Sequence, residues 1–199
     1  MRPVSNSRTS PRAEATSRLT WVFYTHVVEK LVAEAPPVQD RLRSAFEEHA
    51  TSLLRLCLLL TSRREEAEDL VQEAFVRLAP KVQRLEPDAV GPYLRRIAIN
   101  VWKNRLRRLA AEFRARSRAG PESPGPDPGA PDHAALDREV VLPALRALPP
   151  RQRACVVLRH YLDLPEREVA EMLGCSIGTV KSQTRKALAR LREELGDED

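Results

Sequence analysis

The sequence predicts an all-α protein in which two small helical domains are joined by a flexible Pro- and Gly-rich linker. Only 7 of the 199 residues are Gly and aromatic residues make up 5%, which argues against a β fold with Gly-rich turns and aromatic strands. Apolar residues instead recur at helical spacing on both sides of a segment, 119–132, that holds five Pro and three Gly. We expect helical domains at 41–112 and 134–195, with the linker at 113–133.

Residues 1–40 form an N-terminal extension that we expect to be largely disordered. Its first part is rich in Ser, Arg, Pro and Thr and has too little apolar surface to offset the entropy of an ordered chain. Residues 18–35 could form a short helix, which Pro36 and Pro37 would end.

The first domain contains three helical stretches, of which residues 62–82 are the most regular. Ser62 is the expected N-cap, and acidic residues in the first turn complement the helix dipole. The apolar positions follow the i, i+3, i+4, i+7 rule of a buried face: Ala67, Leu70, Val71, Ala74, Phe75 and Leu78. The opposite side is polar and carries Asp69, Gln72, Glu73 and Arg77.

After a break at Glu86 to Pro92, the third stretch is strongly basic. The chain carries a formal charge of +5, and nine Lys and Arg residues stand against the single acid Glu112 between Arg95 and Arg118. Such a cluster fits a polyanion partner, because each neutralised phosphate releases counterions. A basic, solvated helix face would give the same charge pattern.

The second domain contains the pattern of a helix-turn-helix at 164–195. Leu164 and Pro165 begin a short helix, Gly174 supplies the turn, and Ser176 caps the second helix. The expected buried stripes are Val169, Ala170 and Leu173, then Ile177, Val180, Ala187, Leu188 and Leu191. Outward positions carry side chains suited to base edges and phosphates: Thr179, Lys181, Ser182, Gln183, Arg185 and Lys186.

The remaining features indicate a cytoplasmic location. Cys57, Cys155 and Cys175 lie far apart in apolar helical patterns, as small buried residues in a reducing compartment do. No apolar run is long enough for a membrane span, and no signal peptide is recognisable. We predict neither a metal site nor a cofactor, because no cysteine or histidine pair has ligand spacing.

Three blocks resemble the extracytoplasmic-function (ECF) sigma factors of bacterial RNA polymerase. The segments 67–78 and 93–108 resemble the family's conserved region 2, and 144–192 resembles its region 4. The resemblance implies a two-domain, non-enzymatic polymerase subunit: a region 2 helical bundle that binds core polymerase and the −10 promoter element, and a region 4 helix-turn-helix that binds the −35 element.

The resemblance also implies roles for individual residues. Core polymerase, through the clamp helices of its largest subunit, would bind Asp69, Gln72, Glu73 and Arg77. The opened −10 element would bind Tyr93, Arg95, Arg96, Asn100, Lys103, Asn104, Arg107 and Arg108. The −35 element would bind Ser176, Thr179, Lys181, Ser182, Gln183, Arg185 and Lys186. Trp102 is equally compatible with base stacking and with the core.

Two other functions compete with this interpretation. A stand-alone helix-turn-helix regulator would explain 134–195 equally well, but would leave the acidic and basic helices of the first domain without a role. An enzyme is a weaker candidate, because the scattered histidines form no triad and no phosphate-binding Gly-rich loop exists. A sigma factor with two linked domains also implies a regulator that hides both, so we expect an anti-sigma factor as a further partner.

Overall fold

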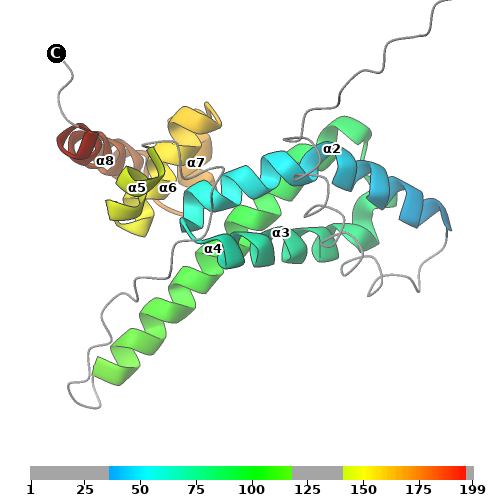
Figure 1. The fold of residues 1–199 in the computed structure, drawn as a ribbon, viewed down its shortest axis with the longest axis horizontal. Coiled ribbons are helices and arrows are strands. Elements are labelled where there is room, and N and C mark those ends of the chain that lie inside the picture. The colour runs from blue at the N-terminus through cyan, green and yellow to red at the C-terminus, as the bar shows by residue number, and fades with distance from the viewer. Residues whose placement is uncertain (1–35, 118–140, 196–199) are drawn as a thin grey trace, which may run out of the picture.

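The computed structural model describes residues 36–117 and 141–195, and within these ranges the chain is helical apart from short turns (Figure 1). The all-α prediction is confirmed; the expected helix at 18–35 and most of the linker lie outside the described residues. The elements are, in chain order, α2 (Pro36–Thr61), α3 (Arg64–Leu78), the 3₁₀ turn η1 (Ala79–Arg84), α4 (Pro87–Ser117), α5 (Val141–Ala147), α6 (Pro150–Val156), the π turn η2 (Val157–Tyr161), α7 (Glu166–Leu173) and α8 (Ile177–Leu195).

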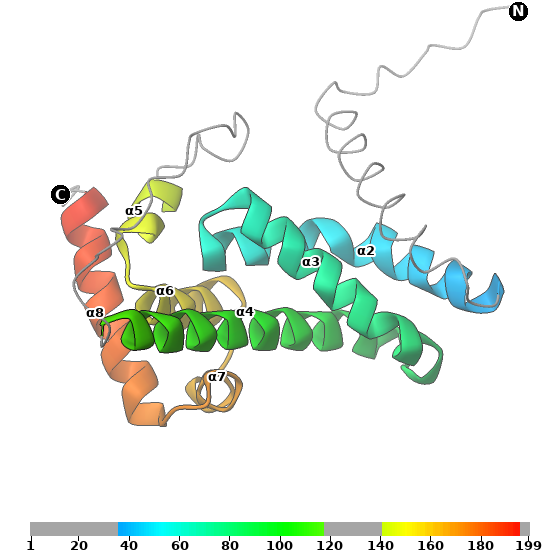
Figure 2. The same ribbon diagram turned by 90° about the horizontal axis from the view of Figure 1, so that it is seen from below.

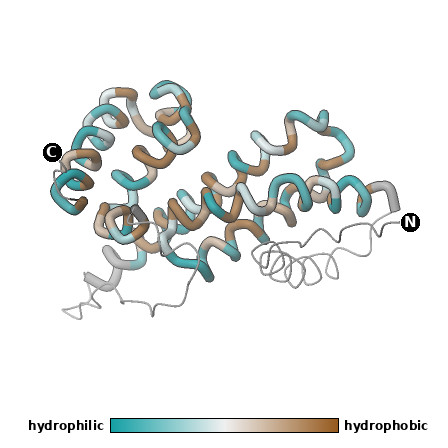
Figure 3. The backbone as a smooth tube through the Cα atoms, turned by 45° about the horizontal axis from the view of Figure 1, so that its top comes forward, coloured by the Kyte–Doolittle hydropathy of each residue, from teal (hydrophilic) through white to brown (hydrophobic). Residues whose placement is uncertain are grey.

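Helices α2, α3 and α4 pack together as the first helical unit. All six apolar residues predicted to be buried in α3 are buried, none exposing more than 4% of its surface. Phe75 of α3 packs on Phe46 of α2 with ring centroids 5.1 Å apart. Trp102 of α4 is also buried, which places it in the core rather than on a base-stacking surface. Figure 3 shows the hydrophobic residues gathered where these helices run together.

The turn between α2 and α3 differs from the prediction. The N-cap of α3 is Arg63 rather than Ser62, and the Thr61 hydroxyl accepts the hydrogen bond from the Arg63 backbone N–H at 3.2 Å. Ser62 is instead buried in a left-handed conformation with φ 58°. The prediction was wrong because the Ser62 side chain is used by a contact from the second half of the chain, described below.

The helix boundaries around η1 also differ from those expected. Helix α3 ends at Leu78 and continues as a 3₁₀ turn, because Pro80 lacks the N–H that an α-helical turn would use. Helix α4 then begins at Pro87, so Pro92 lies inside the helix instead of before it. Pro92 lies in the second turn, so the helix loses one backbone hydrogen bond there, the one that an N–H at this position would donate to the Asp88 carbonyl.

Helices α5 to α8 form the second unit, with α8 packed on α6 and α7. Pro150 occupies the first turn of α6, where its missing N–H would have had no helical acceptor. The chain leaves α6 through a π turn and a left-handed residue, Asp163 at φ 51°, before α7 begins. Val169, Val180 and Ala187 are fully buried between the helices.

The two helical units pack on each other. Helix α7 contacts α4 and lies across it (Figure 2), and α2 contacts α6. Buried side chains from both units form one continuous hydrophobic cluster. The second unit therefore rests on the side of the first unit, against the helix that carries the basic cluster.

Candidate nucleic-acid interface

The helix-turn-helix of α7 and α8 has the local geometry that the sequence predicted. Gly174 is left-handed at φ 66°, and its N–H and that of Cys175 bond back to the last turn of α7. The Ser176 hydroxyl accepts the Thr179 backbone N–H at 3.1 Å and so caps α8. Ile177, expected to be buried, is 44% exposed, because the first turn of α8 extends past the edge of α7.

The outward side of α8 is cationic. Lys181, Arg185 and Lys186 are exposed, whereas Thr179, Ser182 and Gln183 are half-buried at its edges. The Ser182 hydroxyl donates to the Thr179 backbone carbonyl at 3.0 Å, and the Thr179 hydroxyl lies 2.9 Å from that of Ser176, so both side chains are engaged at the start of the helix. The Lys181 Nζ lies 3.6 Å from the Glu166 carboxylate of α7, so an external anion would compete with an internal one at Lys181.

One side of α4 carries most of the residues predicted to meet the −10 element. Six of them repeat at intervals of three and four and therefore share a face: Tyr93, Arg96, Asn100, Lys103, Asn104 and Arg107. Arg95 and Arg108 lie at the sides of this face, and Arg108 is paired with Glu112 at 3.6 Å. We call the six-residue set the basic face of α4.

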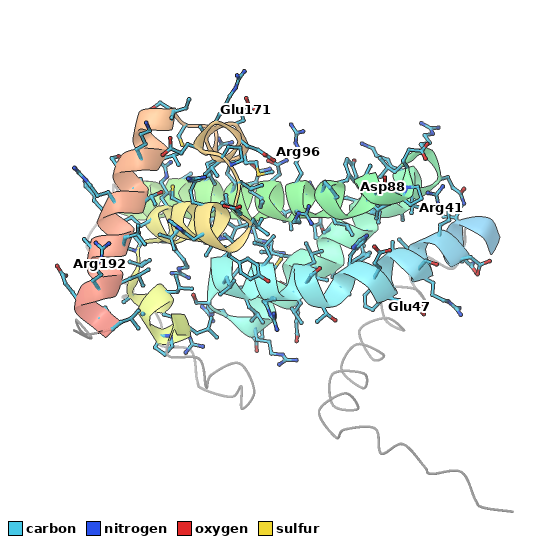
Figure 4. All side chains as sticks on the ribbon, turned by 90° about the horizontal axis from the view of Figure 1, so that it is seen from above. Arg41, Glu47, Asp88, Arg96, Glu171 and Arg192 are labelled. Carbon is cyan, nitrogen blue, oxygen red and sulfur yellow. The ribbon has the colours of Figure 1, made fainter. Side chains whose placement is uncertain are left out.

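Helix α7 covers part of this basic face. The Lys103 ammonium donates to the Met172 carbonyl at 2.7 Å, and an Arg107 guanidinium nitrogen lies 3.4 Å from where a Cβ on Gly174 would be. Burial in this contact lowers the pKa of Lys103, and the neighbouring charges of Arg107 and Arg96 lower it further. Arg96 and Glu171 line a hollow of about 330 Å³ between the two helices (Figure 4).

Helix α3 presents an exposed acidic face beside α4. Asp69 is 62% exposed, and Glu73 accepts a hydrogen bond from the Arg77 guanidinium at 2.7 Å. Val76 is 42% exposed next to these residues, although the sequence reasoning assigned it no role. The sequence contains the information to predict this exposure. Val76 lies outside the i, i+3, i+4, i+7 spacing of the buried face of α3, so its apolar side chain has to point outward.

Two arginines of the second unit hold the α2–α3 turn. Arg153 of α6 is buried and donates to the Ser62 hydroxyl at 2.7 Å, to the Leu60 carbonyl at 3.4 Å and to the Leu148 carbonyl at 3.1 Å. Arg146 of α5 donates to the Ser62 carbonyl at 3.2 Å. No local sequence pattern signals this contact, because its partners are about ninety residues apart.

Among the described residues no group of three or more His, Cys, Asp or Glu is placed to hold a metal ion. None of the described helices combines the length and the apolar character that crossing a membrane requires.

Comparison with known proteins identifies both units. The family model of sigma-70 region 2 matches residues 45–112, and that of sigma-70 region 4 matches residues 138–191. The RNA polymerase sigma-E factor of Streptomyces coelicolor is 39% identical over 160 residues, which cover 75% of this chain and 85% of that protein. The ECF RNA polymerase sigma factor SigL of Mycobacterium tuberculosis is 33% identical over 165 residues, covering 78% and 90%.

A solved structure shows the same fold. The Bartonella quintana sigma factor RpoE, crystallised in complex with the anti-sigma factor NepR, aligns with a TM-score of 0.54 and 27% identity, covering 75% of this chain and 92% of that one. The two helical units are thus region 2 and region 4 of an RNA polymerase sigma factor, a subunit without enzymatic activity. The chain belongs to the ECF sigma factors.

Proposed function

We propose that this sigma factor recruits core polymerase through the acidic face of α3 and reads promoters through α4 and α8. The observation that carries the proposal is that an exposed acidic face and a basic face lie on neighbouring helices of region 2, while region 4 presents a cationic recognition helix. A polymerase subunit that must hold both protein and DNA needs surfaces of opposite charge.

The polymerase-binding surface in this proposal is Asp69, Gln72, Glu73 and Arg77, with Val76 beside them. Exposed carboxylates suit an Arg-rich partner helix, because charge-assisted hydrogen bonds to Arg are strong and directional. Val76 adds an exposed apolar side chain beside these charged groups. A partner that packs on Val76 would exclude water from that part of the interface. The acidic face remains accessible while region 4 is packed on region 2.

The −10 surface in this proposal is the basic face of α4, with Arg95 and Arg108 at its sides. A protein without ATP must recover the cost of unstacking bases by binding the separated strand. Lys and Arg side chains supply contacts for the phosphates, and Asn100 and Asn104 supply donors and acceptors for base edges. Tyr93 is half-buried with the Lys81 ammonium 5.6 Å from its ring centre, so a base reaching that ring would meet an additional positive charge.

The −35 surface in this proposal is the outward side of α8 with its N-terminal turn. Arg185 is suited to a guanine edge and Gln183 to an adenine edge, while Lys181 and Lys186 are suited to phosphates. Ser176, Thr179 and Ser182 complete the surface at the helix start.

The proposed location is the cytoplasm, and the proposed partners include an anti-sigma factor as well as core polymerase and promoter DNA. The Bartonella relative was crystallised with such a regulator, and a chain with two separate binding units can be inactivated by one protein that covers both. Affinity purification of the tagged protein from native extract is expected to recover a small protein in addition to polymerase subunits. Recovery of polymerase subunits alone would contradict this part of the proposal.

Run-off transcription with sigma-free core polymerase tests the proposal as a whole. The wild-type protein is expected to produce specific transcripts from promoter fragments of its own genome, and Asp69→Ala/Glu73→Ala is expected to abolish them by preventing core binding. Glu193→Ala/Glu194→Ala is the matched control, because it removes the same charge from the exposed end of α8. Equal transcription by both double variants would overturn the assignment of the acidic face.

A further inference from the structure

The first turn of α8 carries one apolar side chain that the surrounding helices do not cover. Ile177, the first residue of α8, is 44% exposed, whereas Val180 and Ala187 farther along the same helix are fully buried. Figure 2 shows this end of α8 at the periphery of region 4, beside α7. The −35 surface described above consists of polar and cationic side chains, so it leaves Ile177 without a role.

The other residues of this turn leave Ile177 as its projecting side chain. The Ser176 hydroxyl accepts the Thr179 backbone N–H at 3.1 Å and lies 2.9 Å from the Thr179 hydroxyl, so both polar side chains are engaged locally. Gly178 is exposed and has no side chain, and a Cβ built on it would meet only the Ser176 Oγ within 4 Å. The backbone at this end of α8 can therefore approach the floor of a groove closely.

Ile177 shares a helix face with the exposed cations of α8. Lys181 and Arg185 follow it at intervals of four residues, and both are exposed. A recognition helix that enters the major groove brings its N-terminal residues to the base edges. Cations farther along the same face suit phosphates or a guanine, so Ile177 lies at the end of the face that meets a neighbouring base.

We propose that Ile177 recognises a thymine of the −35 element through the 5-methyl group of that base. In the major groove this methyl group is an apolar feature that the other three bases lack. Contact with an exposed isoleucine removes apolar surface of both groups from water, which favours binding. The inference rests on the proposed −35 role of α8 and adds a specificity-determining residue to it.

Removing the methyl group from the DNA and the side chain from the protein tests this contact from both sides. Deoxyuridine pairs as thymidine does and lacks only the methyl group, so it replaces each thymidine of the −35 element in turn, in both strands of a promoter fragment that the wild-type holoenzyme transcribes. Competition binding measures the affinity of each fragment for holoenzymes assembled with wild-type, Ile177→Ala and Leu195→Ala protein. Leu195→Ala is the matched control, because it truncates another exposed apolar residue at the opposite end of α8.

The wild-type holoenzyme is expected to lose affinity about fourfold when the contacted thymidine is replaced, as the loss of one buried methyl group predicts. Ile177→Ala should bind the unmodified fragment more weakly than wild type and should not respond further to deoxyuridine at that position. Leu195→Ala should behave as wild type at every position. Thermal melts of the free sigma factors should agree closely, because both truncated side chains are substantially exposed.

Two outcomes would overturn the contact with thymine. One is that the wild-type holoenzyme responds to deoxyuridine at no position, and the other is that wild type and Ile177→Ala respond equally at every position. A fragment with a scrambled −35 element separates both outcomes from failure of the proposed function. Equal binding of the scrambled and natural fragments by wild type would contradict the −35 role of α8 together with the role of Ile177. Preference for the natural fragment, combined with either of the two outcomes, would contradict the role of Ile177 alone.

Discussion

Arg105 of α4 faces Asp69 of α3 across the region 2 bundle, with its Nη1 3.4 Å from the Asp69 Oδ2. The basic helix therefore supplies an internal partner to a carboxylate of the proposed polymerase-binding surface. On the proposed role of Asp69, core polymerase would compete with Arg105 for this carboxylate. Helix α4 thus pairs with the acidic face of α3 through Arg105, a residue outside its basic face.

Arg105→Gln is expected to raise the affinity for core polymerase, because Asp69 is then free for the incoming Arg-rich surface. The free energy of unfolding should change by less than about 0.5 kcal/mol, since both side chains are substantially exposed. Core binding without DNA, measured by anisotropy of a labelled protein, checks the first expectation. Arg108→Gln, which breaks the comparable Arg108–Glu112 pair on the same helix, should leave core affinity unchanged.

Phe75→Ala is expected to destabilise region 2 by about 3–5 kcal/mol, because it removes a fully buried ring that packs on Phe46. Urea denaturation followed by circular dichroism measures the loss. A change below about 1 kcal/mol would show that this packing is not formed in solution.

Val76→Ala is expected to weaken core binding and to leave the stability of region 2 almost unchanged. This is the reverse of the effect expected for Phe75→Ala, although the two residues are adjacent in the chain. The Val76 side chain is 42% exposed, so the free energy of unfolding should change by no more than about 0.5 kcal/mol. The affinity for core polymerase should fall, on the order of fivefold, because an apolar contact within the charged surface is lost. Undiminished core binding would exclude Val76 from the interface.

Gly174→Ala and Gly178→Ala are expected to change stability in opposite directions. Gly174 is left-handed, where a Cβ costs about 1–2 kcal/mol, and the new methyl group would also press on Arg107. Gly178 lies in α8, where a Cβ would meet only the Ser176 Oγ at 3.8 Å, an ordinary van der Waals contact, so alanine there should stabilise region 4 by up to about 1 kcal/mol. Thermal melts of both variants are the measurement, and a loss of stability in both would contradict the assigned geometry.

The buried cysteines predict a loss of stability in alkaline solution. Burial raises the pKa of Cys155 to about 11, with nearby Cys175 adding to the shift and Arg151 opposing it. Burial also raises the pKa of Cys57 to about 12, with Arg105 opposing. An unfolded thiol ionises near pH ~8.5, so above that pH the unfolded chain holds fewer protons than the folded one, and the free energy of unfolding falls as pH rises.

Urea titrations at neutral pH and between about pH 9 and pH 11 check this expectation. Cys155→Ala removes one of the two titrating thiols, so its free energy of unfolding should fall less steeply with pH than that of the wild type. Parallel slopes for the two proteins would contradict the assigned burial. At neutral pH both buried thiols should stay unreactive toward a thiol reagent in the folded protein, because thiol and not thiolate is present.

Helix α3 shows how much of this protein is readable from its sequence. Its six buried residues follow from the helical period alone, because a helix side that faces a core must be apolar at every turn. The cap at Ser176 and the turn at Gly174 were likewise predictable, since both depend on residues within one turn of each other. The family itself was evident from three ordered motifs.

The errors have a shared origin in contacts beyond the local segment. Ser62 has the local pattern of an N-cap but serves as the acceptor for Arg153, which is 91 residues away. Cys175, expected to be buried, is half-exposed, and Ile177 is exposed, because the start of α8 protrudes beyond α7. Pro92 was expected to precede a helix, yet α4 begins at Pro87 and tolerates it.

The sequence by itself determined the helices, the two sigma regions and the chemical character of their exposed faces, because hydrophobic period, capping and motif spacing act over a few turns of chain. Only the tertiary structure decided that Arg153 meets Ser62 and that Lys103 meets the end of α7. Those pairings depend on how two separately patterned units fit together, and the free energy of that fit comes from burial and hydrogen bonds between residues that no local pattern relates.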